Sequence, residues 1–255
     1  MYKDNLILID TQGERVGQIN GLAVYDADFY SFGRPTRITA TVSLGSGAII
    51  NVEREAGMSG RHYNKGVLII SGYFRETFGQ DMPLSFNANL VFEQSYGMVE
   101  GDSASCTEIF ALLSVLANLP LKQSIAVTGS LNQKGDVQPI GGVNEKIEGF
   151  FDICKLQGLT GTQGVIFPIQ NIRDLMLKEE VIEAVKKGIF HLYPISRVEE
   201  GIEILTGVKA GKKTAKGYEV GSVFYLVEKR IKELYEKSRQ IRTQNNNQQK
   251  KKTKK

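Results

Sequence analysis

Residues 5–55 alternate between apolar and polar side chains in several short runs. The runs VGQINGLAVYDADFYSFG, RITATVSLG and AIINVERE are separated by Gly, Ser, Asp and Pro, which favour turns. Alternation with a period of two gives each strand one apolar face, and short separations favour antiparallel pairing. This zone is therefore predicted to be a β-rich N-terminal lobe.

Helical and strand patterns alternate through the rest of the chain. Apolar residues at helical spacing predict helices at 65–78, 105–118, from about Asn144 onward, 172–188 and 219–241. Other apolar runs predict strands at 83–97, 124–131, 164–168 and 190–195. Strands that alternate with helices indicate a mixed sheet with helices packed on it. The tail, residues 242–255, has no apolar side chain to bury and is predicted to be disordered.

The charge of the chain is concentrated at its C-terminus. The 255 residues carry 32 Lys and Arg against 28 Asp and Glu, a net charge of +4. Residues 238–255 hold seven of the basic residues and none of the acidic ones, so the rest of the chain has 25 minus 28, or −3. The body is not basic, which disfavours a nucleic-acid partner.

The cysteines and the apolar runs narrow the class of protein further. Cys106 and Cys154 form no C-x-x-C pair, and no histidine cluster has metal-ligand spacing, so we expect no metal site. No run approaches eighteen apolar residues, and the N-terminus has no signal-peptide pattern. We expect a soluble cytoplasmic protein with one sizeable core and no membrane partner.

The stretch VEGDSASCTEIFALL, residues 99–113, places Asp102, Ser103 and Ser105 directly before a helical apolar run. Ser105 and Glu108 fit a capping box, and Ser103 also fits an N-cap, so either hydroxyl can satisfy the free amides of a helix start. The alternative is a nucleophilic serine, which needs a base.

The candidate bases for such a serine are the two histidines and a lysine. His62 follows a Gly-containing turn and His191 lies in an apolar run, which favours structural roles for both. Lysine replaces histidine in some serine dyads when burial lowers its pKa. Lys146 follows two glycines and precedes Ile147 and Phe150, so apolar neighbours are available to desolvate its amine. A solvated lysine in the first turn of a helix is the alternative.

Three separated motifs resemble the proteolytic domain of Lon proteases, nearer to the B-type and related bacterial forms than to the A-type. They are NGLAVYDADFYSFGRPTRITATV at 20–42, GDSAS at 101–105 and AVTGSLNQKGDVQPIGGVNEK at 126–146. The resemblance implies an α+β fold with mixed β-sheets, a β-rich N-terminal lobe and packed helices. We predict a Lon-type proteolytic domain at 1–208, a helical extension at 209–241 and a basic tail at 242–255.

The resemblance implies a serine endopeptidase with a Ser-Lys dyad. The nucleophile of the family is assigned here to the last serine of GDSAS, Ser105, and the base to the lysine that closes GGVNEK, Lys146. Thr128 is assigned to orient the amine. Asp102 matches an aspartate that pairs with the lysine in some isolated domains, and such pairing silences the base. The backbone amides of Ser105 and Cys106 are assigned to the oxyanion.

The same resemblance implies the partners. An extended substrate is expected beside the strand formed by Gly97, Met98, Val99 and Glu100, bound through main-chain hydrogen bonds. Unfolded or damaged proteins would be delivered by an AAA+ ATPase module, in cis or in trans, and the family assembles as homo-hexamers. No cofactor is expected in this domain; ATP and Mg²⁺ would serve only the ATPase module. The segment GVKAGKKT, residues 207–214, lacks one residue of a phosphate-binding loop.

The same residues are compatible with other functions. An inactive Lon-like domain could act as a binding or assembly module, with Asp102 holding the lysine in its charged form. A nucleic-acid adaptor would depend on the basic tail. Cys106 could be a thiol nucleophile, although a small buried helix residue is the simpler interpretation. Ser130 stands where the A-type motif has an acid after T-G, which leaves the contacts on the substrate side open.

Overall fold

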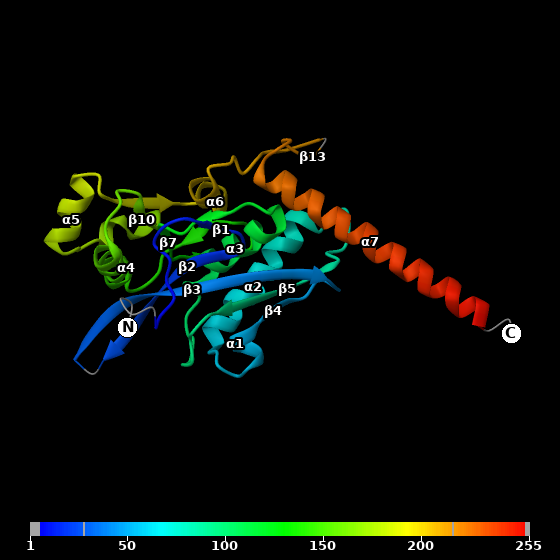
Figure 1. Ribbon diagram of the computed structural model, residues 1–255, viewed down its shortest axis with the longest axis horizontal. Helices are drawn as coiled ribbons and strands as arrows, with labels where there is room; N and C mark the ends of the chain where they lie inside the picture. The colour runs from blue at the N-terminus through cyan, green and yellow to red at the C-terminus, as the bar shows by residue number, and fades with distance from the viewer. Residues whose placement is uncertain (1–5, 28, 216, 253–255) are drawn as a thin grey trace.

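The computed structural model describes residues 6–27, 29–215 and 217–252, and within them the central element is a seven-stranded mixed sheet (Figure 1). The strand order is β11-β10-β7-β2-β3-β5-β4. Strands β7, β10 and β11 run parallel to β2, whereas β3 runs antiparallel to β2 and β5. The strands of this sheet are β2 Gln18–Ala27, β3 Tyr30–Leu44, β4 Ile49–Asn51, β5 Phe86–Phe92, β7 Ile125–Val127, β10 Gln163–Pro168 and β11 Phe190–Ile195. The mixed sheet confirms the predicted fold class.

The β-rich N-terminal lobe is built on one long hairpin. Strands β2 and β3 pair from Gln18↔Thr39 to Ala27↔Tyr30, and the hairpin curves away from the body at its tip (Figure 1). Three two-stranded sheets complete the β-structure of the described residues. They pair β1 Glu14–Arg15 with β6 Leu121–Lys122, β8 Ser130–Leu131 with β9 Val137–Gln138, and β12 Lys213–Thr214 with β13 Gly217–Tyr218.

Helix α3, Ser105–Ala117, lies at the centre of the molecule. The apolar stripe predicted for it is too narrow, because every residue of the helix except Val115 is buried. The helix is therefore surrounded by other elements, and its buried residues include the polar Thr107, Glu108 and Ser114. It ends at Asn118, which has a left-handed backbone conformation and precedes Leu119 and Pro120.

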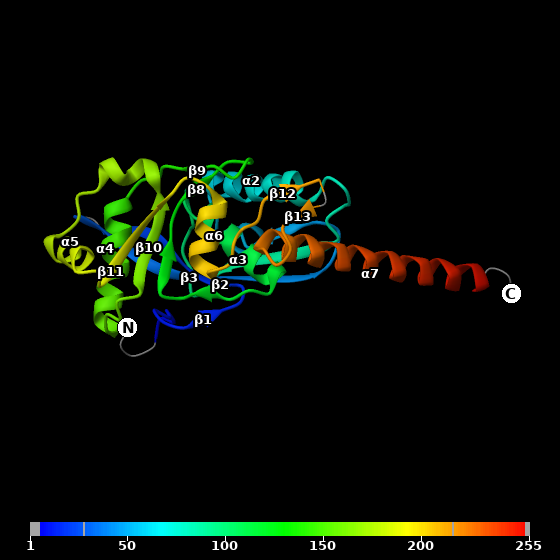
Figure 2. The same cartoon turned by 90° about the horizontal axis from the view of Figure 1, so that it is seen from above.

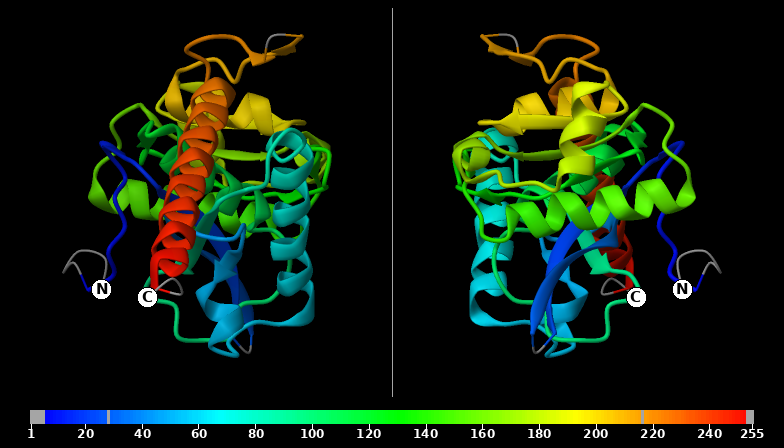
Figure 3. Two further views of the ribbon diagram at one scale, coloured as in Figure 1. Left: turned by 90° about the vertical axis from the view of Figure 1, so that its right-hand side faces the viewer. Right: turned by 90° about the vertical axis from the view of Figure 1, so that its left-hand side faces the viewer.

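The other helices surround the sheet and α3. Helix α2 runs along one side of the body, and α4 lies across the end that faces the viewer in the right-hand panel of Figure 3. Figure 2 shows α4 and α5 at one end and α7 leaving the other. The bounds are α1 Val52–Glu55, α2 Arg61–Phe78, α4 Val143–Gln157, the 3-10 helix η1 Ile169–Asp174, α5 Glu179–Lys186, α6 Val198–Thr206 and α7 Val223–Lys252.

Within the described residues, two apolar clusters form the core. The larger cluster joins α2, α3, α6 and the start of α7 to β3 and β5. The smaller one joins α4, α5, β10 and β11, with Phe150, Phe151 and Phe190 among its members. The predicted extension, residues 209–241, therefore contributes side chains, such as Phe224 and Ile231, to the same core as the preceding residues.

The helix predicted at 172–188 is two shorter elements. The chain forms η1 to Asp174, a linker, and then α5 from Glu179. In the linker, the Met176 amide donates to Asn144 and the Lys178 amide donates to Glu148, so side chains of α4 satisfy the backbone there. These contacts between elements are not visible in a helical repeat.

The tail also departs from its prediction. Disorder was predicted from residue 242, but α7 continues to Lys252. Gln, Lys and Arg have favourable helix propensities, and residues that extend an existing helix avoid the cost of nucleation. The rest of the predicted tail, residues 253–255, lies outside the described residues. None of the helices in the described part of the chain combines the length and apolar character that crossing a membrane requires.

Candidate active site

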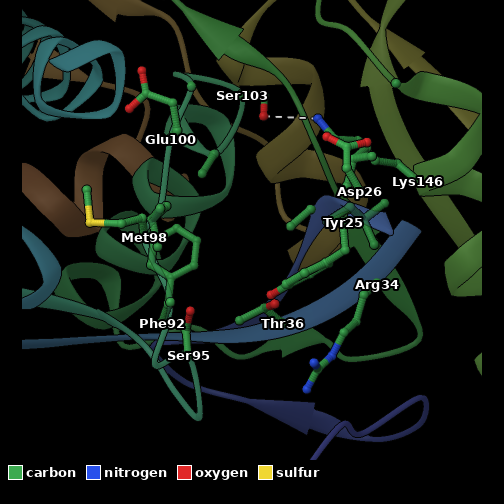
Figure 4. Close-up of a pocket in the computed structure, with 18 of the residues that line it drawn as sticks. Tyr25, Asp26, Arg34, Thr36, Phe92, Ser95, Met98, Glu100, Ser103 and Lys146 are labelled. Carbon is green, nitrogen blue, oxygen red and sulfur yellow. Dashed lines mark hydrogen bonds between the residues drawn. The ribbon is translucent and has the colours of Figure 1, made fainter. Parts of the chain in front are cut away.

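A cleft of about 880 Å³ lies between the hairpin and the segment that precedes α3. Strand β2 lines it from Leu22 to Asp26, and the segment from Gln94 to Gly101 forms the facing wall. Ser103 and Lys146 lie together at one end of the cleft (Figure 4). Of the two serines in the GDSAS motif, Ser103 lines this cleft and Ser105 does not.

Lys146 reaches the cleft because α4 packs directly on β3. A Cβ atom on Gly33 would lie 1.8 Å from the carbonyl oxygen of Glu145, and one on Gly149 would lie 2.0 Å from the carbonyl oxygen of Gly33. Only glycine permits so close an approach of two backbones. The two glycines therefore place the first turn of α4 against the hairpin.

The environment of Lys146 is apolar, as its neighbours in the sequence predicted. The residue is 4% exposed. Burial lowers the pKa of its amine from 10.5 to about 8, while the carboxylates of Asp102 and Glu145 oppose part of that shift. A substantial fraction of the amine is then neutral near physiological pH, which a general base requires.

The partner of Lys146 is Ser103. The Nζ atom of Lys146 lies 3.0 Å from the Oγ atom of Ser103 (Figure 4). The carbonyl oxygen of Ser103 accepts hydrogen bonds from the Gly129 amide at 2.8 Å and from the Thr128 hydroxyl at 3.4 Å. The T-G segment between β7 and β8 thus holds the backbone of Ser103 beside the amine.

Ser105 does not contact Lys146, contrary to the pairing predicted from the motif. Its hydroxyl donates to the carbonyl oxygen of Asp102 at 2.6 Å, and its amide donates to the same oxygen at 3.1 Å. Ser105 is the first residue of α3 and is 1% exposed. Ser105 therefore closes the turn before the helix but does not cap it: the N-cap residue is Ala104, and no side chain of the described residues accepts from the first amides of α3, contrary to the capping interpretation. Ser103 has the position expected of a nucleophile.

The predicted oxyanion donors are also engaged elsewhere. The Ser105 amide is bonded to Asp102, and the Cys106 amide donates to the Gly129 carbonyl at 3.1 Å. The amides of Ser103 and Ala104, just before α3, form no hydrogen bond with the residues that the structure describes. Free amides at a helix N-terminus attract negative charge. These two are the available donors.

Neither Thr128 nor Asp102 contacts the Lys146 amine in this structure. Thr128 donates to the carbonyl of Ser103 and, among the described residues, forms no hydrogen bond with Lys146. The Oδ2 atom of Asp102 accepts a hydrogen bond from the Ser130 hydroxyl at 2.8 Å. No carboxylate of the described chain is ion-paired with Lys146. The pairing of Asp102 with the lysine, which the inactive alternative requires, is therefore absent from this structure.

Cys106 is unsuited to nucleophilic chemistry. Its side chain is fully buried, its thiol contacts the carbonyl oxygen of Ser130 at 3.5 Å, and burial raises the pKa of the thiol well above its usual range. It is a small core residue of α3.

The predicted substrate strand forms one wall of the cleft. The Val99 amide donates to Met58, and the Val99 carbonyl accepts from Gly60. Because backbone groups of successive residues in an extended chain point in opposite directions, those of Met98 and Glu100 face away from residues 58–60. Gly97, Met98, Val99 and Glu100 all line the cleft.

The facing wall also offers backbone groups. Strand β2 pairs with β7 only at Asn20 and Gly21. Beyond Gly21, that edge of β2 has no strand partner among the described residues. Exposed strand edges are binding sites for extended peptides.

Behind the site lies a buried polar network that the sequence did not indicate. Glu108 of α3 accepts hydrogen bonds from the Tyr63 hydroxyl and, at 3.1 Å, from the Asn51 side chain. Burial is the main cause that raises the pKa of the Glu108 carboxyl to about 8, and Glu53 nearby raises it further. Its only signal in the sequence is the glutamate of the capping-box pattern, which here does not cap the helix.

Metal ligands do not cluster in the described part of the chain: no three or more His, Cys, Asp or Glu side chains there are placed to hold an ion.

Comparison with known proteins identifies one family. A model of the Lon protease (S16) C-terminal proteolytic domain matches residues 96–207. The chain is 45% identical over 201 residues to a protein of Escherichia coli (strain K12) called "Putative Lon protease homolog", covering 78% of this chain and 34% of that protein. A Haemophilus influenzae protein of the same description is 47% identical over 203 residues, covering 79% of this chain and 34% of its own length.

An archaeal protein extends the comparison. The "Archaeal Lon protease" of Archaeoglobus fulgidus is 32% identical over 213 residues, which cover 83% of this chain and 31% of that protein. The chain spans about a third of the length of the curated relatives it matches.

Proposed function

The chain belongs to the Lon protease (S16) family through its proteolytic domain, and on that premise we propose that it is a serine endopeptidase with Ser103 as nucleophile and Lys146 as general base. The observation that carries the proposal is the 3.0 Å contact between the Lys146 amine and the Ser103 hydroxyl. It is supported by the burial that lowers the pKa of that amine and by the cleft that both side chains share. Ser103 thus replaces Ser105 as the proposed nucleophile.

The reaction is acyl transfer. The neutral amine of Lys146 takes the proton of the Ser103 hydroxyl as its oxygen bonds to the scissile carbonyl carbon. The resulting ammonium returns the proton to the leaving nitrogen as the C–N bond breaks. Water then attacks the acyl-enzyme, Lys146 again takes a proton, and the serine hydroxyl is restored. This dyad calls for no metal or nucleotide.

The negative oxygen of each tetrahedral intermediate is placed near the amides of Ser103 and Ala104. Both lack partners among the described residues, and they precede α3, whose dipole adds positive potential at this end. The assignment replaces the donors predicted from the sequence.

The substrate lies extended between β2 and residues 97–100. Met98 and Glu100 on one side and the free edge of β2 on the other supply main-chain hydrogen bonds. The apolar residues of the cleft, which include Leu22, Val24 and Phe92, favour apolar substrate side chains.

The proposal extends to the assembly of which this domain is a part. An AAA+ ATPase module, in cis or in trans, delivers unfolded or damaged proteins, and ATP and Mg²⁺ serve that module. Six copies form a ring in the cytoplasm that admits unfolded chains to the cleft.

The test is hydrolysis of casein and of a fluorogenic peptide with apolar residues. The wild type, Ser103→Ala, Lys146→Ala and Ser105→Ala are compared, with oligomer size measured for each. The proposal predicts that the first two variants lose activity and that Ser105→Ala, the matched control, retains it. An assembled wild type that hydrolyses neither substrate would favour the inactive binding module instead.

A further inference from the structure

The carboxylate of Asp102 is held by a buried hydroxyl. The residue directly precedes Ser103, and its Oδ2 atom lies 2.8 Å from the Oγ atom of Ser130. Ser130 is 3% exposed, and its backbone is paired with Gln138 in the two-stranded sheet of β8 and β9. The hydroxyl therefore has a fixed position relative to the catalytic cleft.

Ser130 has a second acceptor, but it is a poorer one. The Oε1 atom of Gln138, an exposed residue, lies 3.5 Å from the Ser130 hydroxyl. A hydroxyl has one proton to donate, and a charged acceptor at the shorter distance forms the stronger hydrogen bond. Asp102 is therefore the preferred partner.

The same carboxylate acts on Lys146 from a distance. Asp102 raises the pKa of the Lys146 amine, although it forms no ion pair with it, and Glu145 of α4 acts in the same direction. The other charged residues that line the cleft with the amine are Asp26 of β2, Arg34 of β3 and Glu100. Because the lysine is buried, a carboxylate that moved into contact would be attracted strongly.

We propose that Ser130 is a positioning residue whose hydroxyl retains the Asp102 carboxylate and so leaves the Lys146 amine paired with Ser103. The inference rests on the proposed function of these two residues. If the hydroxyl is lost, Asp102 has no donor at that position and turns toward the lysine. Contact with a carboxylate stabilises the ammonium form, which cannot accept the proton of Ser103.

A purely structural role for Ser130 predicts a different result. Removing one buried hydrogen bond costs about 1 kcal/mol of stability but leaves the titration of the lysine unchanged. The pH dependence of activity therefore separates the two roles.

The experiment compares Ser130→Ala, Ser130→Thr, Asp102→Asn and the double variant Ser130→Ala/Asp102→Asn in the full chain. The readout is kcat/KM for a fluorogenic peptide from about pH 6 to about pH 10, a range that contains the lysine titration. Ser130→Ala is expected to raise by about one pH unit the pH at which kcat/KM falls on the acid side of the profile, called here the acid limb. At pH values below that limb, kcat/KM of the variant is then about tenfold lower than that of the wild type. Ser130→Thr keeps the hydroxyl and should retain the wild-type limb.

The double variant decides the cause. Without a negative charge at position 102, loss of the Ser130 hydroxyl should no longer raise the pH at which kcat/KM falls on the acid side. The proposal is overturned if Ser130→Ala leaves the limb unchanged, or if the double variant shows the same upward shift as Ser130→Ala.

A direct titration separates this inference from the proposed function. NMR of ¹⁵N-labelled lysine follows the Lys146 amine in Ser103→Ala, where no hydrolysis is needed. An upward shift of the Lys146 pKa on adding Ser130→Ala supports the positioning role even if the wild type hydrolyses no peptide. An unchanged pKa overturns it even if the wild type is an active peptidase.

Discussion

Lys146 Nζ lies 3.0 Å from Ser103 Oγ, two residues before the serine that the motif GDSAS had suggested as nucleophile. The hydroxyl of Ser105 instead donates to the carbonyl of Asp102. Neither serine caps α3, and the serine placed to react with the amine is Ser103 rather than Ser105. Ser103, the proposed nucleophile, lies on the loop and lines the cleft, whereas Ser105 is the first residue of the helix and is buried.

Ser105→Ala should destabilise the protein without silencing it. The substitution removes the side-chain hydrogen bond that closes the turn before α3, and such losses cost about 1 kcal/mol. Denaturant unfolding should show a lower midpoint, and peptide hydrolysis should remain within a few-fold of the wild type. Complete loss of activity in a folded Ser105→Ala protein would contradict the assignment of roles.

The activity should rise with pH through about 8. The reactive form of Lys146 is the neutral amine, and burial places its pKa at about 8. Below that pH the neutral fraction falls about tenfold per pH unit, and above it the fraction approaches one. The measurement is kcat/KM against pH. A flat profile between about pH 6 and about pH 9 would show that no such base is used.

Lys146→Met should lose activity yet gain stability. The pKa of the lysine is 10.5 when exposed and about 8 in the folded protein, so the unfolded chain binds more protons between these values. Wild-type stability should therefore rise as pH increases from about 8 to about 10.5. Methionine removes the buried charge, and at neutral pH the gain should be about 2 kcal/mol.

The pH dependence of the free energy of unfolding is the control for this prediction. The free energy of unfolding of Lys146→Met should vary less than that of the wild type between about pH 8 and about pH 10. If the variant is less stable than the wild type at pH 7, the amine is not held in an unfavourable environment.

Glu108→Gln should remove a pH dependence of the opposite sign. Its carboxyl has a raised pKa of about 8 against 4.5 when exposed, so the folded protein binds more protons between these values. Wild-type stability contributed by this group should fall as pH rises from about 4.5 to about 8. Glutamine keeps an oxygen that can accept from Tyr63 and Asn51.

Unfolding curves at pH 5 and pH 8 test this expectation. Glu108→Gln should be more stable than the wild type at pH 8, by about 1 to 3 kcal/mol, with a smaller difference at pH 5. Equal differences at both values would mean that the carboxyl is already ionised at pH 5 or neutral throughout.

Met98→Pro should weaken binding of polypeptide substrates. Proline removes the backbone amide of a residue whose polar groups face away from residues 58–60. The expected result is a raised KM, with Met98→Ala as the control because the side chain itself is 67% exposed. If both variants raise KM equally, the side chain rather than the amide makes the contact.

The sequence predicted the elements that have a strong local pattern. The helix after Ser105, the strand at 190–195 and the β-rich lobe all appear in the structure. The short helix α6, Val198–Thr206, was missed, and the helix predicted at 172–188 was too long. Both errors arise where contacts with other elements, rather than local periodicity, fix the backbone.

The candidate site was predicted only in part. The glycine bend and the apolar neighbours make Lys146 a candidate base, and the resemblance assigns it that role; the structure buries it as expected. The nucleophile predicted from the motif was Ser105, whereas Lys146 contacts Ser103. The two serines are separated only by Ala104, and the sequence does not show which hydroxyl faces the amine. The hydrogen bond between Asp102 and Ser130 joins residues 28 positions apart and has no local signature.

Covalent labelling of the wild type with a fluorophosphonate at about pH 8, followed by mass-spectrometric mapping of the adduct, tests the identity of the nucleophile directly. The Ser103–Lys146 dyad predicts an adduct on Ser103 that is absent from Ser103→Ala, greatly slowed in Lys146→Ala and retained in Ser105→Ala. An adduct on Ser105, or labelling of Ser103 at the same rate in Lys146→Ala, would contradict the Ser103–Lys146 dyad.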